Sequence, residues 1–353
     1  LARQAPASPA RQAAKSGPPA PGRWKDPRFI DRNTAAQVLA QVPEDEDMSL
    51  EQTTSMLVAL AGRPFGTLTP EIASSARFER LMSLAERNLR EAKGDRDYSR
   101  LLQRVAGSVL RLRSKALAAE RLVPAIRERV AKEINNFRPM DVCGILTMDY
   151  LADRELLKAS EPVLLRKLRV FSPQLLSNIT LAHAQLGHRN PRILDEIASH
   201  AIRKMDMFEP YHMVSLLESM ATLHHHVPVL MEQAGRKAAR NIGLYSPMEN
   251  SRLVWAYATL RNNNTALFSA VAKAAQWKID LFSPDSLGLM MWGFGTMQQT
   301  YPSLMENVAR KVVVDMDDFD DRALVRILWS FARLRVFDGD LMDELAPRLI
   351  QDL

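Results

Sequence analysis

Blocks of apolar and polar residues repeat along this chain with a period of 37 residues. Within one block, Leu253, Ala256 and Leu260 recur at the spacing of one face of an α-helix. The stretch 265–277 carries a second apolar face of similar period, and the polar segment 261–264 separates the two. The apolar–polar alternation of a β-strand is absent from these stretches. The pattern therefore predicts an all-α protein built from helical hairpins.

Several independent columns of residues carry the period. An aromatic residue opens each unit: Phe171, Phe208, Tyr245, Phe282 and Phe319 are 37 residues apart, and Phe137 precedes them by 34 residues. A column of small residues keeps the same register at Ala198, Gly235, Ala272, Ala309 and Ala346. A fixed period of this length is typical of a solenoid, in which each unit buries its apolar face against its neighbours. We therefore expect a right-handed α-solenoid of 37-residue helical hairpins, with the aromatic residues in packing roles.

A Ser-Pro pair marks the start of the first helix in several units. Ser172, Ser246 and Ser283 suit the N-cap, where a hydroxyl accepts a hydrogen bond from a free backbone N–H. The Pro that follows each of them suits the first helical position, because its missing N–H would have no partner inside the helix. We expect a helix to begin directly after each pair.

The chain divides into three regions by composition. Residues 1–30 form a basic arm rich in Pro and Ala, which suits either an organellar targeting remnant or a disordered linker. Residues 31–135 are less regular: 97–133 resembles a degenerate unit, 49–61 suggests another, and 71–93 has the pattern of an extra, inserted helix. Residues 136–353 are expected to hold about six regular repeats.

Charge is distributed unevenly around a formal net charge of +6. Between residues 96 and 132, ten Lys and Arg face three acidic residues, whereas an acidic cluster follows Val314. Since Lys and Arg supply most sequence-independent affinity for nucleic acid, the basic stretch is a candidate for RNA contact. The candidates there are Arg100, Arg104, Arg111, Arg113 and Lys115.

Two further sets of candidates lie in the regular repeats. The fourth, eighth, eleventh and fifteenth positions of the unit, counted from its aromatic residue, share one face of the first helix. Residues on this face that vary and are often polar suit base reading, and the candidates are Asn178, Arg252 and Arg326. A second set would form a basic stripe along the second helices, at Arg203, Lys204, Arg236, Lys237, Arg240, Lys273, Arg310 and Lys311. For every one of these residues, an ordinary solvated face is the alternative interpretation.

Other conspicuous residues favour structural interpretations. Trp255, Trp292 and Trp329 share one repeat position and could stack on bases, but an inter-repeat core is the favoured interpretation. The run 224–226 of three histidines lacks the spacing of a metal site, and the single cysteine, Cys143, sits at a packing position. We find no nucleotide-binding loop and no run of apolar residues that could span a membrane. No enzyme activity, cofactor, metal or small-molecule substrate is therefore expected.

The repeat motif resembles a known family. The segments 254–260, 328–334 and 180–186 follow a Leu/Trp-Ala-Tyr/Phe-Ala-x-Leu pattern, which resembles the heptatricopeptide repeat family and is similar to octotricopeptide and FAST-kinase-like repeats. The resemblance covers residues 137–353. It implies an organellar, mostly mitochondrial, RNA-binding protein, and some members look like structural parts of organellar ribosomes.

These observations predict a non-catalytic RNA-binding scaffold in the mitochondrial matrix, with the plastid as the alternative. The most specific hypothesis is a structural subunit of a divergent mitochondrial ribosome that holds ribosomal RNA among neighbouring proteins. One alternative is a free factor that processes or protects an organellar transcript. Another is a protein–protein adaptor in a large mitochondrial complex, which the mixed charge of the repeats also suits.

Overall fold

The computed structural model describes residues 35–44, 46–62, 68–91, 98–113, 117–148 and 151–351. Every regular element among these residues is a helix, which confirms the predicted all-α class. The basic arm lies outside the described residues. The chain forms two compact units, Leu1–Asn136 and Phe137–Leu353.

The first unit is built around two pairs of longer helices. Helix α3 packs against α5 and α6, and α5 packs against α7. The segment expected to be an inserted helix forms α5, whose apolar face packs against α3 and α7. The unit contains α2 (Ala35–Leu39), α3 (Leu50–Ala61), α4 (Pro70–Ala73), α5 (Ala76–Glu91), α6 (Tyr98–Arg113), η2 (Leu117–Arg121), α7 (Leu122–Glu133) and η3 (Ile134–Asn136).

The second unit repeats one hairpin, in which a short 3-10 turn links each second helix to the next unit. The first helices are α8 (Pro139–Leu146), α10 (Pro173–Gln185), α12 (Pro210–Thr222), α14 (Pro247–Thr259), α16 (Pro284–Met297) and α18 (Asp321–Leu334). The second helices are α9 (Arg154–Lys167), α11 (Pro191–Arg203), α13 (Pro228–Arg240), α15 (Thr265–Trp277), α17 (Pro302–Val314) and α19 (Gly339–Gln351). The turns are η4 (Leu168–Val170), η5 (Met205–Met207), η6 (Ile242–Leu244), η7 (Ile279–Leu281) and η8 (Met316–Asp318).

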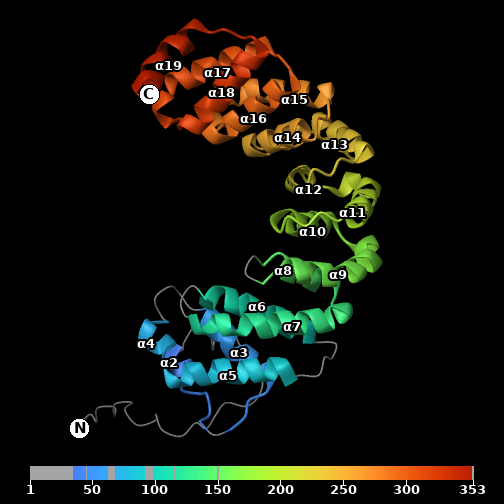
Figure 1. The fold of residues 1–353 in the computed structure, drawn as a ribbon, viewed down its shortest axis with the longest axis vertical. Helices are drawn as coiled ribbons and strands as arrows, with labels where there is room; N and C mark the ends of the chain where they lie inside the picture. The colour runs from blue at the N-terminus through green and yellow to red at the C-terminus, as the bar shows by residue number, and fades with distance from the viewer. Residues whose placement is uncertain are drawn as a thin grey trace, which may run out of the picture. The chain divides into compact units, whose positions relative to one another are not determined.

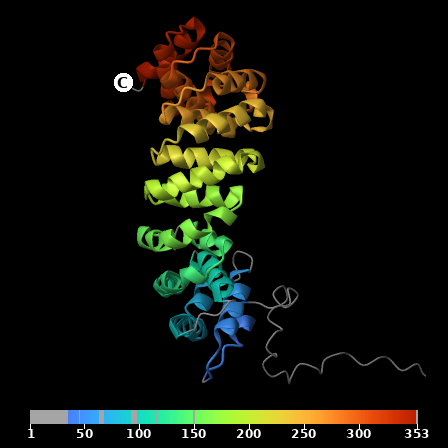
Figure 2. The same cartoon turned by 90° about the vertical axis from the view of Figure 1, so that its right-hand side faces the viewer.

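The helices of the second unit stack in two layers. Each first helix packs against the first helix of the next hairpin, and the second helices do the same. Within residues 137–353, the first helices lie on the inner side of the curve in Figure 1. Figure 2 looks from the side of the second helices and shows them running across the direction of the stack. The first helices therefore expose one side of this stack to solvent, and the second helices expose the other side.

Caps define the start of the first helices as the sequence predicts. The hydroxyl of Ser172 accepts a hydrogen bond from the N–H of Leu175, and Pro173 is the first helical residue. Ser246 and Glu249 form a reciprocal capping box on α14. Where Ser is replaced, Asp320 supplies the capping oxygen for α18.

Small and aromatic residues hold the layers close together. All the aromatic residues that open the units are buried, as predicted. A Cβ added at Gly295 would lie 3.0 Å from the Cα of Ser330, and one at Gly288 would lie 3.1 Å from the Cα of Ala323. Larger side chains at these two positions would separate α16 from α18, because such contacts leave no room for a methyl group.

One fully buried polar residue interrupts an otherwise apolar column of first-helix positions. The column reads Leu176, Met213, Asn250, Leu287 and Leu324 in successive repeats, and all five residues are buried. Neither the side-chain oxygen nor the nitrogen of Asn250 has a hydrogen-bond partner. A buried amide without partners costs folding free energy.

Replacing this amide should stabilise the second unit. We expect Asn250→Leu to raise the free energy of unfolding by about 1–3 kcal/mol, since it removes an unpaired amide and restores the apolar column. Urea denaturation followed by circular dichroism measures the change. Gln185→Leu, at an exposed amide on α10, is the control and should change stability by less than about 0.5 kcal/mol. A loss of stability in Asn250→Leu would contradict the conclusion that the buried Asn250 amide has no hydrogen-bond partner.

A buried histidine in α10 makes the second unit sensitive to acid. Burial lowers the pKa of His183, and the nearby His188 lowers it further, although the backbone hydrogen bond to His188 opposes both effects. The Nδ1 atom of His183 lies 3.0 Å from the carbonyl oxygen of His188, while Nε2 has no partner. The ring is therefore held neutral in the fold.

Stability should consequently fall as the pH falls below that of unfolded histidine. The unfolded chain binds the proton first, at a pKa near 6.5, so acid favours unfolding from there down through the lowered folded pKa. We expect the free energy of unfolding to drop between about pH 7 and pH 5, and the drop to shrink in His183→Gln. Burial, with Arg203 nearby, also lowers the pKa of His200, so His200→Gln is the comparison variant. An unchanged pH dependence in His183→Gln would contradict the prediction.

Candidate nucleic-acid interface

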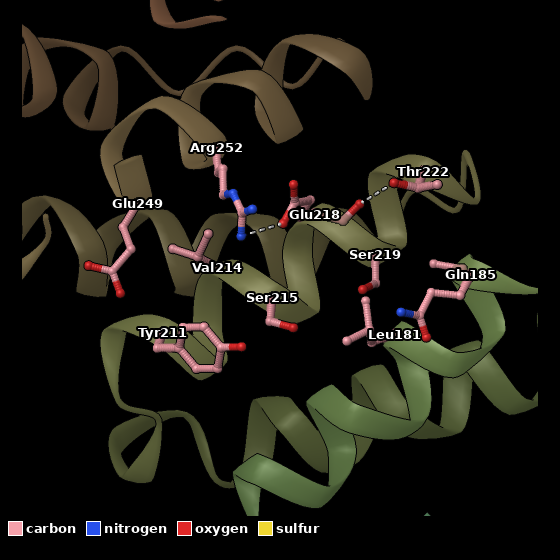
Figure 3. Close-up of a pocket in the computed structure, with 11 residues that line it drawn as sticks. Leu181, Gln185, Tyr211, Val214, Ser215, Glu218, Ser219, Thr222, Glu249 and Arg252 are labelled. Carbon is pink, nitrogen blue, oxygen red and sulfur yellow. Dashed lines mark hydrogen bonds and ion pairs between the residues drawn. The ribbon is translucent and has the colours of Figure 1, made fainter. Parts of the chain in front are cut away.

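The exposed face of the first helices brings together residues that are distant in sequence. A groove of about 380 Å³ crosses α10, α12 and α14 (Figure 3). Several of its lining residues occupy the repeat positions that the sequence analysis assigns to a reading face. They are Leu181, Gln185, Tyr211, Ser215, Glu218, Thr222 and Arg252. The predicted face is thus continuous across three repeats.

The groove has mixed polarity and little net charge. Nη1 of Arg252 lies 3.5 Å from Oε2 of Glu218, and the hydroxyl of Thr222 donates to the Glu218 carbonyl oxygen at 3.0 Å (Figure 3). Burial raises the pKa of the Glu218 carboxyl, and Arg252 partly offsets this effect. Glu249 adds a second carboxylate beside the exposed ring of Tyr211. This arrangement suits hydrogen bonding and stacking with a neutral group better than binding of a phosphate.

A column of tryptophans continues this face towards the C-terminal repeats. Trp255 and Trp292 are half-buried on α14 and α16, and Trp329 on α18 is 43 % exposed. The favoured interpretation of an inter-repeat core is therefore wrong for Trp329. The reason is its position on the helix: Ser330 and Phe331, which follow it, point into the stack, whereas the Trp329 ring covers Gly295 from the solvent side.

Arginines accumulate beside the last of these tryptophans. Arg322 and Arg333 are exposed on α18, and Arg326 is half-buried between them. Arg322 pairs with Asp285 of the preceding repeat at 2.9 Å. The predicted residues Arg252 and Arg326 share one repeat position, as does Asn178 on α10. The first-helix face therefore changes from mixed charge on α12 to basic and aromatic on α18.

The predicted basic stripe on the second helices separates into two groups. In the first group, lysine ammonium groups bind backbone carbonyls of the preceding linker. Nζ of Lys237 donates to the carbonyl oxygens of Met205, Asp206 and Phe208 at 2.8, 2.9 and 2.7 Å. Lys204 reaches the carbonyl oxygens of Arg169 and Phe171 in the same way. These lysines hold successive repeats together.

The second group faces solvent. Arg236 pairs with Glu232 at 2.7 Å, and Arg310 donates to Asn307 at 2.7 Å. Arg240 and Lys273 are exposed and lie at a shallow hollow between α13 and α15. Of the other two candidates, Nη2 of Arg203 lies 3.0 Å from Nδ1 of His200, and Lys311 pairs with Asp315 at 2.8 Å.

Four of the five basic candidates of the first unit lie on α6. Arg100, Arg104 and Arg111 are exposed there. Lys115 and the side chain of Arg113 lie outside the described residues.

The histidines take part in a ladder at the hairpin turns that the sequence analysis did not detect. His188 contacts Glu161 at 2.7 Å and His225 contacts Asp195 at 2.9 Å. Asn262 and Gln299 occupy the same repeat position and also reach the preceding repeat, at His226 and Asn263. In the sequence, these polar residues recur at the repeat spacing, but their type changes from His to Asn and Gln along the series.

Cys143 is buried within the second unit. Burial raises the pKa of its thiol to about 12, which disfavours the reactive thiolate. Its Sγ faces the carbonyl oxygen of Leu175 on the next first helix at 3.8 Å. The residue therefore contributes to packing between repeats.

The described residues define an all-helical protein of repeated hairpins whose first-helix face is partly aromatic. The sequence model of the RNA-editing substrate-binding complex 6 protein matches residues 166–351. Because this match covers more than half of the chain, the protein belongs to that family. No curated protein matches the chain. Among the described residues, no helix has both the length and the apolar character needed to cross a membrane.

The two groups of basic residues should respond differently to removal of charge. We expect Lys237→Met to lower the free energy of unfolding by about 1–3 kcal/mol, because the carbonyl oxygens that it binds lose a charged donor. Lys273→Met, on the next second helix, should change stability by less than about 0.5 kcal/mol. Urea denaturation of both variants measures the difference. Equal effects would contradict the structural role of Lys237.

Proposed function

We propose that this protein is a non-catalytic RNA-binding scaffold in a mitochondrial RNA-editing assembly. The observation that carries the proposal is the in-register column Trp255, Trp292 and Trp329 on the exposed face of adjacent first helices. The family match supports it, because the name of that family refers to a complex that binds the substrate of RNA editing.

In this proposal the second unit is a right-handed α-solenoid of heptatricopeptide-like repeats. Successive first helices pack in one layer, and helices packed in this way lie about 8–10 Å apart. Tryptophans on neighbouring helices are therefore too widely spaced for contiguous stacked bases. One base per repeat, as in other helical-repeat readers of RNA, fits this spacing better.

The proposed mechanism combines stacking with limited neutralisation of phosphates. Each tryptophan offers an apolar face to one unpaired base, irrespective of the base identity. Arg326 and Arg333 flank Trp329 and would neutralise phosphates near it. The groove at Glu218 and Arg252 would add hydrogen bonds to the edge of a base. Single-stranded RNA is thus the favoured ligand.

The more specific hypothesis of a ribosomal subunit has no support from the family match, whose name points to RNA editing. A free transcript-protecting factor would instead bind one sequence tightly and sediment alone. Sedimentation of native mitochondrial extract, with this protein and ribosomal RNA followed across the gradient, separates these possibilities. Our proposal expects the protein to sediment with RNA that undergoes editing and away from ribosomal particles.

Removing the tryptophans should weaken RNA binding. Binding of a fluorescein-labelled, uridine-rich single strand is measured by anisotropy with wild type, Trp329→Ala and Trp292→Ala/Trp329→Ala. We expect each substitution to weaken binding by about 5- to 150-fold, because one stacked base contributes about 1–3 kcal/mol. The salt dependence should stay unchanged in these variants and become shallower in Arg326→Gln/Arg333→Gln.

Trp277→Ala is the matched control, because Trp277 is exposed on a second helix and lies outside the proposed RNA face. Its RNA affinity should equal that of wild type. Circular dichroism melting confirms that each variant is folded. Wild-type affinity in both tryptophan variants, combined with a loss in Arg236→Gln/Lys273→Gln, would overturn the proposal and move RNA binding to the second helices.

A further inference from the structure

The solvent side of the linkers carries a column of exposed apolar residues. Val170, Met207, Leu244 and Leu281 end successive 3-10 turns, 37 residues apart, and are 65, 66, 73 and 70 % exposed. None of them is needed for the packing of the repeats. Exposed apolar residues that recur in register on a folded protein mark an interaction surface.

Near α15, a further exposed apolar residue extends this column. Trp277, the last residue of that helix, is 89 % exposed and lies one turn before Leu281. It borders a shallow hollow of about 600 Å³ between α13, η6 and α15, whose floor is formed largely by alanines and by Ile242. An exposed tryptophan beside an apolar hollow is the usual composition of an interface hot spot.

Three cationic residues line the same hollow, and no acidic residue does. They are Arg240, Lys273 and Lys278. Nζ of Lys278 donates to the carbonyl oxygen of Gly243 at 3.1 Å, which ties α15 to η6 beneath the exposed surface. Arg240 and Lys273 are exposed. The surface therefore complements a ligand that is both apolar and acidic.

We infer that the surface formed by Leu244, Trp277, Leu281, Arg240 and Lys273 docks an acidic, amphipathic segment of a partner protein. Apolar side chains of the segment fill the hollow and cover Trp277, and its carboxylates face Arg240 and Lys273. This outer surface lies on the linkers and second helices and does not depend on the RNA-binding proposal.

The aliphatic residues favour a protein over RNA at this surface. Bases stack on aromatic rings and on guanidinium planes, whereas Val170, Met207, Leu244 and Leu281 offer neither. A partner segment with apolar side chains can cover these residues. The column changes at the next linker, where the acidic Asp318 occupies the position of Leu281. The docking surface accordingly ends before η8.

A peptide series tests the inferred chemistry on the full chain. The probes are a fluorescein-labelled helical peptide with Leu anchors and Glu flanks, the same peptide with Lys in place of Glu, and the same peptide with Ser in place of Leu. We expect the acidic Leu peptide to bind best, and Trp277→Ala to weaken that binding by about tenfold or more. Arg240→Glu/Lys273→Glu should reverse the preference in favour of the Lys peptide.

Phe337→Ala provides the matched control, since Phe337 is 81 % exposed away from this surface. It should leave peptide binding unchanged, and Trp329→Ala should weaken RNA binding without affecting the peptide. Equal binding of the three peptides, or no binding at all, would overturn the inference. So would loss of RNA affinity in Trp277→Ala, which would assign the surface to RNA. A dimer in light scattering that Trp277→Ala converts to a monomer would assign it to a second copy of the chain.

Discussion

Each hairpin of residues 137–353 has apolar faces that it can bury only against the hairpins before and after it. The first helices meet this requirement most tightly, because Gly288 and Gly295 allow α16 and α18 to approach until a methyl group would no longer fit. The linkers follow from the same requirement: a buried aromatic residue follows each turn, and lysines such as Lys237 bind backbone carbonyl oxygens of the linker. Stacking thus fixes which residues are structural in every repeat.

The residues that stacking does not require are then free to differ between repeats, and both proposed surfaces consist of such residues. The position of Trp255, Trp292 and Trp329 holds Leu181 and Glu218 in the earlier repeats, which separates an aromatic part of the face from a polar part. On the opposite layer, the position of Trp277 holds Arg240 in the repeat before it. A scaffold of this kind can hold two different ligands on its two layers, since neither layer has to rearrange for the other.

The regular features of the fold could be predicted from the sequence because they recur. The period, the helix starts at Ser172 and Ser246 and the burial of the aromatic residues are all confirmed. The sites were harder to predict, since a helical period gives the face of a residue but not its depth. Trp329 therefore looked like core and is half-exposed, and Lys237 looked like a solvated cation although its ammonium group binds three carbonyl oxygens. The first unit lacked a repeat to compare, so the sequence indicated a helix at α5 but not its packing against α3 and α7.

Charge alone is a weak guide to the ligand of this protein. The lysines in the predicted basic stripe divide between carbonyl oxygens, carboxylates and solvent, so a count of positive residues overstates the number available to phosphates. The groove on α12 is lined by two carboxylates, of Glu218 and Glu249, and by one arginine, Arg252, so it carries no excess of positive charge. Affinity for RNA on this scaffold would then depend on aromatic stacking more than on neutralisation, with a modest salt dependence. Such binding would tolerate different RNA sequences, because every base offers a flat face to an aromatic ring.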